Sequence, residues 1–245
     1  MITDILTVLW KELKEYLHQR GSTRGMVLMI SIPAGIIGIM IPLSAGRMWV
    51  DTPISIVYMA WVSMILVTTM IADSFAGERE RHTLETLLAS RLSDKAIILG
   101  KMFSAMGYAL LLSLIIVILG LITVNIAYGS GELLLFPLSF TLAGAVMCFL
   151  TAFMMSTIGA LVSLKSPTVR QAHQTLSFGV IALWFVPMIV MKLLPKNVVN
   201  IFLNRLNTVN PTLMTVTFMG VFFILDIVLL VVVMARFKRT RLIFD

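Results

Sequence analysis

The sequence is poor in charge and has one cysteine, and both shortages exclude whole classes of protein. Only 13% of its 245 residues are charged, whereas 59% are hydrophobic. A soluble domain of this length needs more charged surface than that, so a soluble protein is excluded. The single cysteine, Cys148, cannot form an internal disulfide and leaves the redox compartment unreadable. Charged residues interrupt positions 1–20, so a signal peptide is not expected.

The common catalytic motifs are also missing. Gly100-Lys101 resembles the end of a phosphate-binding loop, but Met102 follows where Ser or Thr is needed, and Lys95 stands at the position of the first glycine. The chain is therefore not expected to bind ATP through a P-loop of its own. It has no His-Glu-x-x-His and no Gly-x-Ser-x-Gly, so no catalytic residue is assigned. Its three histidines are scattered, and no metal site or cofactor is expected on one copy of the chain.

What the sequence has instead is a series of long apolar runs. Each is close to the ~20 residues that a helix needs to cross a bilayer. They predict an all-α integral membrane protein with six transmembrane helices, in one transmembrane domain over residues 1–245. The predicted spans are residues 26–43, 53–72, 103–126, 137–164, 175–194 and 212–235.

The basic residues fix an expected orientation for these spans. Of the 19 Lys and Arg residues, 15 fall before the first span, in residues 73–101, in residues 165–174 or in the tail, and four fall in the alternate segments. Because cytoplasmic loops carry the excess of Lys and Arg, we expect both termini in the cytoplasm, with the protein in the cell membrane. This distribution explains the net charge of +7 without a nucleic-acid partner.

Two segments outside the spans have helical patterns. Residues 1–25 begin with an apolar stripe opposite charged residues such as Lys11 and Glu12, which predicts an amphipathic helix on the membrane surface. A helix packed on a soluble partner is the alternative. Residues 195–211 contain an asparagine stripe between two prolines, which predicts an external helical segment acting as a lid or a substrate-contacting gate.

Two features within the spans are unusual. Gly144, Cys148, Ala152, Ser156 and Ala160 recur every four residues and predict a face for close helix packing. Asp226 is a carboxylate well inside a predicted span, where such a group is costly, so a compensating partner is expected. Asp226 has either a structural role, with a hydrogen bond to a neighbouring span, or a transport role.

Residues 73–101 form the longest polar interruption. Leu84, Leu87 and Leu88 share one face of a short helix, while Glu78 with His82 and Arg81 with Glu85 have the spacing of i, i+4 pairs. Ser93 is expected to cap a helix that starts at Asp94. An amphipathic helix between two spans suggests a docking surface for a cytoplasmic partner.

This segment resembles the first cytoplasmic loop of type-2 ABC exporter permeases. The matching features are the acidic–basic run 78–81, Thr83-Leu84-Glu85, Leu87-Leu88, Ser93 and Gly100-Lys101. His82 departs from the glycine that is common in the family, and Arg91-Leu92 replaces its usual small-Pro step. The alternative is that the segment is only a charged cytoplasmic anchor.

The resemblance implies a permease subunit that pairs with a second permease subunit, as a homodimer or heterodimer. Two copies of a separate ABC ATPase would hold the ATP and Mg²⁺, and the 73–101 loop would be the coupling helix. The residues that the resemblance assigns to ATPase coupling are Glu78, Arg79, Glu80, Arg81, Thr83, Leu84, Glu85 and Leu88.

The resemblance also places the conduit between the second and fifth spans of the two copies. The substrate is not indicated by the sequence. An integral membrane enzyme acting on lipid is the competing hypothesis, but such enzymes cluster acids or histidines at one depth, and Asp226 stands alone. The conduit candidates are Tyr58, Trp61, Thr68, Ser177, Trp184 and Met188.

Overall fold

The computed structural model describes residues 1–19, 31–129, 131–201 and 211–237. These residues form helices joined by short connections, with no strand among them, which confirms the all-α prediction. Five of the helices are long and apolar enough to cross a bilayer, so the chain is a multi-pass membrane protein. These five are α5 (Ile54–Glu80), α7 (Asp94–Tyr128), α8 (Leu138–Lys165), α9 (Val169–Leu193) and α11 (Pro211–Arg236).

The first predicted span, residues 26–43, is described only in part. Ser31–Ala45 is a shorter apolar helix that contains a π-helical turn, η1 (Ile36–Met40), and continues as α3 (Ile41–Ala45). α4 (Met48–Asp51) then leads into α5. Residues 26–30 lie outside the described part of the chain, so the described residues give five candidate spans and one shorter apolar helix.

α5 is the central helix of the bundle and packs against α7, α8 and α9. Small residues allow its closest approach to α8, since a Cβ atom at Gly159 would lie 2.2 Å from the side chain of Ile71. The Ser163 hydroxyl of α8 accepts from the backbone nitrogen atoms of Phe75 and Ala76, both at 3.0 Å. The small-residue stripe that begins at Gly144 is buried along its length and therefore packs inside the bundle.

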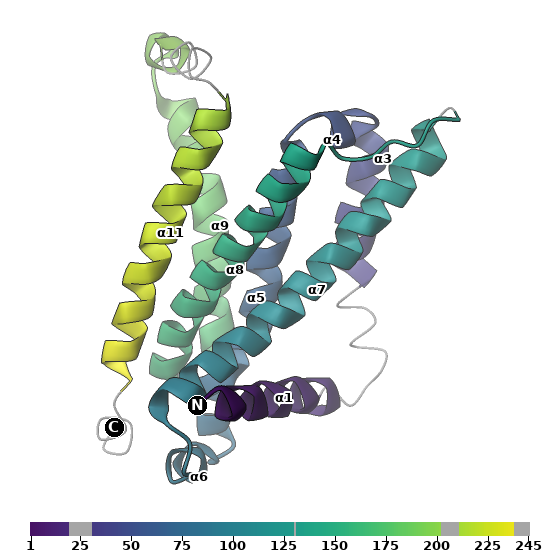
Figure 1. Ribbon diagram of the computed structural model, residues 1–245. Helices are drawn as coiled ribbons and strands as arrows, with labels where there is room; N and C mark the ends of the chain where they lie inside the picture. The colour runs from purple at the N-terminus through teal and green to yellow at the C-terminus, as the bar shows by residue number, and fades with distance from the viewer. Residues whose placement is uncertain (20–30, 130, 202–210, 238–245) are drawn as a thin grey trace.

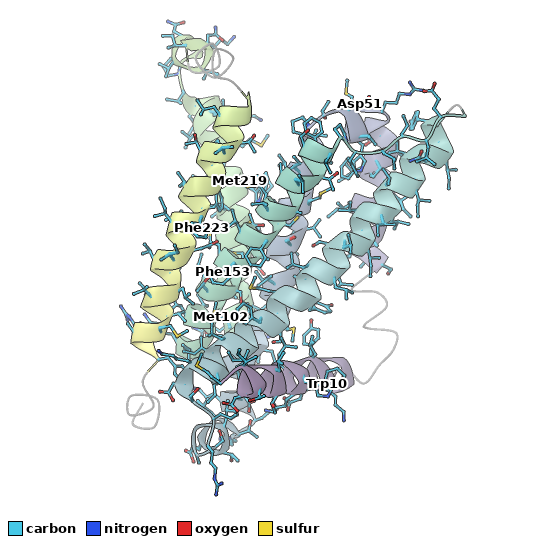
Figure 2. The ribbon with its side chains drawn as sticks, in the orientation of Figure 1. Trp10, Asp51, Met102, Phe153, Met219 and Phe223 are labelled. Carbon is cyan, nitrogen blue, oxygen red and sulfur yellow. The ribbon has the colours of Figure 1, made fainter. Side chains whose placement is uncertain are left out.

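The other helices surround this centre. α11 packs on α8, and α1 (Ile2–Gln19) lies across one end of the bundle against α7 (Figure 1). The short helix α6 (Leu84–Leu88) lies at that same end, whereas α3 and α4 lie at the opposite end (Figure 1). Trp10 of α1 is 70% exposed, so this helix keeps an apolar side chain outside the bundle (Figure 2).

Several helix ends differ from the predicted spans. α5 continues from residue 72 through Glu80, and α9 begins at Val169 rather than at residue 175. Residues 73–80 are helical because their polar side chains find partners within the chain, so they do not need a solvated loop. In the predicted segment 195–211, residues 196–201 are helical, and Asn204 and Asn207 lie outside the described residues.

The predicted cap at Ser93 is confirmed, because its Oγ accepts from the backbone nitrogen of Ala96 at 3.3 Å. The C-terminal end of α5 is capped by backbone hydrogen bonds. The Thr83 backbone nitrogen donates to the Glu78 carbonyl at 2.9 Å and the His82 nitrogen donates to the Arg79 carbonyl at 3.1 Å. This is the Schellman pattern, in which one residue adopts the left-handed conformation. Here that residue is His82, with a φ of 57°.

The left-handed φ of His82 gives a prediction about stability. A side chain at such a φ is strained by about 1–2 kcal/mol, and glycine removes the strain while adding about 0.4–1 kcal/mol of unfolded-state entropy. We expect His82→Gly to raise the thermal unfolding temperature of the purified protein slightly. The matched control is Thr86→Gly, which places glycine inside helix α6 and should lower it. A lower unfolding temperature for His82→Gly would contradict the assignment.

Candidate functional site

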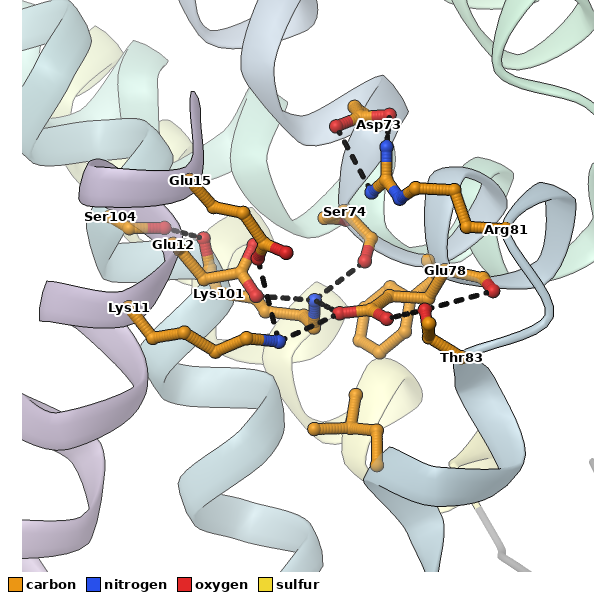
Figure 3. Close-up of polar contacts among 12 residues, drawn as sticks. Lys11, Glu12, Glu15, Asp73, Ser74, Glu78, Arg81, Thr83, Lys101 and Ser104 are labelled. Atoms are coloured by element: carbon orange, nitrogen blue, oxygen red, sulfur yellow. Dashed lines mark hydrogen bonds and ion pairs between the residues drawn. The ribbon is translucent and has the colours of Figure 1, made fainter. Parts of the chain in front are cut away.

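A cluster of charged side chains joins α1, α5 and α7 (Figure 3). Its centre is Lys101 of α7, whose side chain is fully buried. The Lys101 Nζ atom donates to Glu12 Oε1 at 2.6 Å and to the Ser74 carbonyl at 2.7 Å. It also lies 3.4 Å from Glu78 Oε1 and 5.4 Å from the centre of the Phe75 ring. A buried ammonium needs such partners, because an unpaired charge in this position is very costly.

Glu78 of α5 is the main anion of this cluster. The Lys11 Nζ atom donates to its Oε1 at 3.1 Å, and the Thr83 hydroxyl donates to its Oε2. Partial burial alone lowers the pKa of Lys11, but the hydrogen bond and charge of Glu78, with the charges of Glu12 and Glu15, raise this pKa above 10.5. Through its contacts with Lys11, Lys101 and Thr83, Glu78 connects α1 and α7 to the turn that leads into α6.

The approach of α1 to α7 depends on a glycine. A Cβ atom at Gly100 would lie 2.6 Å from the side chain of Val8, so only glycine fits there without a shift. The helical pattern predicted Lys11 and Glu12 on the polar face of the first helix, opposite its apolar stripe, and both belong to the cluster. The role of Lys101 was not predicted, although a lysine followed by a long apolar run is itself a signal that a counter-ion is needed.

Arg79 and Glu80 join α5 to the connection between α8 and α9. Arg79 donates to the carbonyls of Ser166 and Leu164, at 2.7 and 2.9 Å. Glu80 Oε2 accepts from the backbone nitrogen of Val169 at 3.2 Å. Arg79 thus donates to free carbonyl groups at the C-terminal end of α8, and Glu80 accepts from a free amide at the N-terminal end of α9. The helix dipoles favour a cation at the first position and an anion at the second.

The remaining charge of the acidic–basic run, Arg81, pairs with Asp73 at 3.3 Å. The sequence predicted i, i+4 pairs of Glu78 with His82 and of Arg81 with Glu85. This prediction is wrong, because neither pair lies within one helix. α5 ends at Glu80 and the chain reverses at His82, which breaks the helical spacing.

α6 presents a polar surface and buries an apolar one. Leu84 is 7% exposed and belongs to the core, so its side chain packs inside this chain. Leu87 is half-buried against the core, whereas Glu85 and Thr86 are exposed. The side chain of Leu88 lies outside the described residues. An external partner would therefore meet the polar side of α6.

Four of the six conduit candidates line one cavity of about 340 Å³ between α5 and α9. Its aromatic rings form a chain: the Tyr58 and Trp61 centroids are 6.4 Å apart, and those of Trp61 and Trp184 are 5.7 Å apart. Met188 completes the four. The aromatic residues of α5 thus lie opposite those of α9 within one chain, whereas the resemblance had paired these two spans across two copies.

The other two candidates lie elsewhere. Thr68 is buried and donates to the Ile65 carbonyl at 2.6 Å, and the Ser177 hydroxyl lies 3.3 Å from His173 Nδ1. Neither lines the aromatic cavity. His173 instead lines a polar cavity of about 540 Å³ at the α1 end of the same helix pair, with Tyr16, Thr69, Asp73, Glu80, Val169, Arg170 and Gln174.

Asp226 of α11 is 3% exposed. Neither of its carboxyl oxygen atoms has a hydrogen-bond partner among the described residues. The expected hydrogen bond to a neighbouring span is therefore not formed within the part of the chain that the structure covers.

The carboxyl groups of Glu12, Glu15 and Glu78 could each offer an oxygen atom within 4.8 Å of the others, a spacing that a metal ion could use. Two ammonium groups already occupy this cluster, however, because Lys101 pairs with Glu12 and Glu78, and Lys11 pairs with Glu15 and Glu78. Their charges offset most of the negative charge, so we interpret the cluster as a network of ion pairs.

The network predicts a large effect of Lys101→Met. Removing this ammonium leaves the largely buried Glu12 without its ion-pair partner and Glu78 with Lys11 alone, and breaking a buried pair in this way costs about 3–5 kcal/mol. We expect a clear fall in thermal stability in detergent, with partial recovery when Glu78→Gln is added. The control is Lys95→Met, an exposed lysine of the same helix, which should change stability by about 0.5 kcal/mol or less. Equal effects of the two lysine variants would contradict the network.

Comparison with known proteins identifies the family. No curated protein and no solved structure matches the chain. A family model described as "ABC-2 type transporter" matches residues 3–211, which include α1, the ion-pair network, α6 and both cavities between α5 and α9. The match extends over most of the chain, from the second residue of α1 to the start of α11. The chain therefore belongs to the ABC-2 type transporter family, as a membrane transport subunit.

Proposed function

We propose that this chain is the permease subunit of an ATP-driven exporter and that α6 couples it to a separate ATPase chain. The observation that carries the proposal is the attachment of α6. The helix lies at the end of the bundle, and the Glu78–Lys101 network holds the helices on both sides of it. A push on α6 would therefore reach α5 and α7 together.

The polar side of α6 makes the contact with the ATPase in this proposal. Glu85 and Thr86 are exposed, so they can meet a partner without unfolding. Glu78, Arg79 and Leu84 act from within, by holding α6 in place. ATP and Mg²⁺ belong to two copies of the ATPase, since this sequence has no P-loop.

The translocation path in this proposal runs along α5 and α9 and is completed by a second permease subunit. Two cavities on this helix pair support it, the polar one at the α1 end and the aromatic one near the other end. Trp61 and Trp184 would contact cargo in the aromatic part. Much of α9 is exposed in a single subunit, which leaves surface for the second copy.

The proposed topology has six spans, with the Ser31–Ala45 helix as part of the first. α1 then lies on the cytoplasmic surface of the cell membrane, with exposed Ile2, Leu6 and Trp10 toward lipid. The basic residues near α1 and α6 support cytoplasmic termini. A lipid-modifying enzyme is less well supported, because the one cluster of acids within the described residues is held by lysines.

A charge reversal on α6 tests the coupling role. We expect Glu85→Arg to leave the protein folded in the membrane but to reduce co-purification of its ATPase and ATP-driven transport several-fold. The matched control is Glu132→Arg, an exposed glutamate at the opposite end of the bundle, which should affect neither. Normal ATPase binding and transport in Glu85→Arg would remove this face of α6 from the proposal.

We propose a structural role for Asp226, whose buried carboxyl group gains a hydrogen-bond partner when the helices repack in the assembled complex. Asp226→Asn retains polarity and shape, so this variant is expected to assemble and to keep most transport. Asp226→Leu loses the polar contact and should lower the yield of complex on gel filtration. An Asn variant that assembles normally but does not transport would instead assign Asp226 to the transport step.

A further inference from the structure

A third cavity lies on the side of α5 that faces α7 and α8, and no residue of α9 lines it. It measures about 360 Å³, within the range of small-molecule sites and more than twice a ~150 Å³ apolar cavity that binds benzene. Helices α5, α7 and α8 form its walls, and Phe136 lies at one end. Its lining residues are Ser55, Met59, Leu110, Ser113, Leu114, Val117, Phe136, Phe140, Thr141, Gly144, Ala145, Cys148 and Phe149.

One polar atom in this apolar wall lacks a partner. The Ser55 side chain is fully buried, and its Oγ has no hydrogen-bond partner within the described chain. By contrast, Ser113 donates to the Ala109 carbonyl at 2.8 Å, and Thr141 donates to the Pro137 carbonyl at 3.2 Å. A buried hydroxyl without a partner costs about 1–3 kcal/mol, so Ser55 indicates an acceptor from outside this chain.

The cavity follows the helices from the first turns of α5 and α8 to Phe149 of α8. Ser55 lies in the first turn of α5 and Thr141 in the first turn of α8, at the end of the bundle opposite α1. Cys148 lies deeper, roughly 15 Å along α8 from Leu138 at 1.5 Å per residue. The hydrocarbon core is about 30 Å thick, so the cavity covers about one leaflet.

The cavity also opens toward the outside of the bundle. Leu114 and Phe149 line it and are 59% and 49% exposed. We propose that this cavity binds one acyl chain of a membrane phospholipid, with the ester carbonyl of that lipid accepting a hydrogen bond from Ser55. The ester oxygen of a phospholipid lies where the acyl chain begins, at the depth of the first helical turns. The apolar wall accommodates the chain below it.

The acyl chain accounts for the site better than two other occupants. Transport cargo has its proposed path between α5 and α9, whereas this cavity lies between α5, α7 and α8 and has no lining residue from α9. A second copy of the chain would present side chains from a helix surface, which does not fill a deep cavity that runs along the helix axes. Lipid is present at high concentration at this position in any membrane.

Photo-crosslinking in lipid nanodiscs tests the proposal. The probe is a phosphatidylglycerol with a diazirine in the middle of one acyl chain, and labelled peptides are mapped by mass spectrometry. We expect labels in residues 110–117 of α7 and 140–149 of α8. Ala145→Phe fills the cavity and should reduce these labels several-fold. Val146→Phe is the matched control, because Val146 is exposed on the same helix but does not line the cavity.

A second variant tests the polar contact without filling the cavity. Ser55→Ala removes one hydrogen bond and should lower the labelling of these peptides by about two- to tenfold. Gel filtration and thermal unfolding verify that each variant is folded. Equal labelling in wild type and Ala145→Phe would overturn the proposal. Absent labelling in wild type, with dissociation of a dimer by Ala145→Phe, would also overturn it and assign the cavity to a contact between copies.

Discussion

The packing of α1 and α5 on α7 depends on one buried cation, which must be paired and hydrogen-bonded. Lys101 has a fully buried side chain next to apolar packing, and such a charge is stable only when it is paired and hydrogen-bonded. Its three partners come from two other helices: Glu12 from α1, and Glu78 and the Ser74 carbonyl from α5. The requirement therefore fixes the positions of α1 and α5 relative to α7.

This arrangement explains the acidic–basic run next to α6. Glu78 and Arg79 are held within the chain, and Glu80 and Arg81 also have partners there. The run thus holds the ends of α5, α8 and α9 together, while the turn at His82 directs the chain into α6. In the proposed transporter, the exposed side of α6 receives force and the buried side transmits it.

The sequence predicted the helices well and their contacts less well. The long apolar runs and the Ser93 cap depend on local composition, and both were recovered from the sequence. Tyr58, Trp61 and Trp184 were named together because the family resemblance pairs the second and fifth spans, and the structure places them around one cavity within a single chain. Helical spacing gives the face of a residue but not which helix lies opposite.

The pairing of Lys11, Glu12 and Lys101 is non-local, with nearly 90 residues between Glu12 and Lys101. A helical projection put Lys11 and Glu12 on a solvated face because polar residues usually lie there, and it could not reveal a buried lysine on another helix. The inward direction of Leu84 was missed for the same reason. An amphipathic helix has an apolar face, but the sequence does not tell whether that face packs on its own chain or on a partner.

The most direct test of the account is a distance measurement between α1 and α6. Spin labels at Thr7→Cys and Thr86→Cys, in a Cys148→Ser background, report this distance by pulsed electron paramagnetic resonance. Both sites are exposed. With the network intact, we predict one narrow distance distribution, and Lys101→Met should broaden it. A broad distribution with the network intact, or an equally narrow one in Lys101→Met, would contradict the claim that the buried cation holds α6 in place.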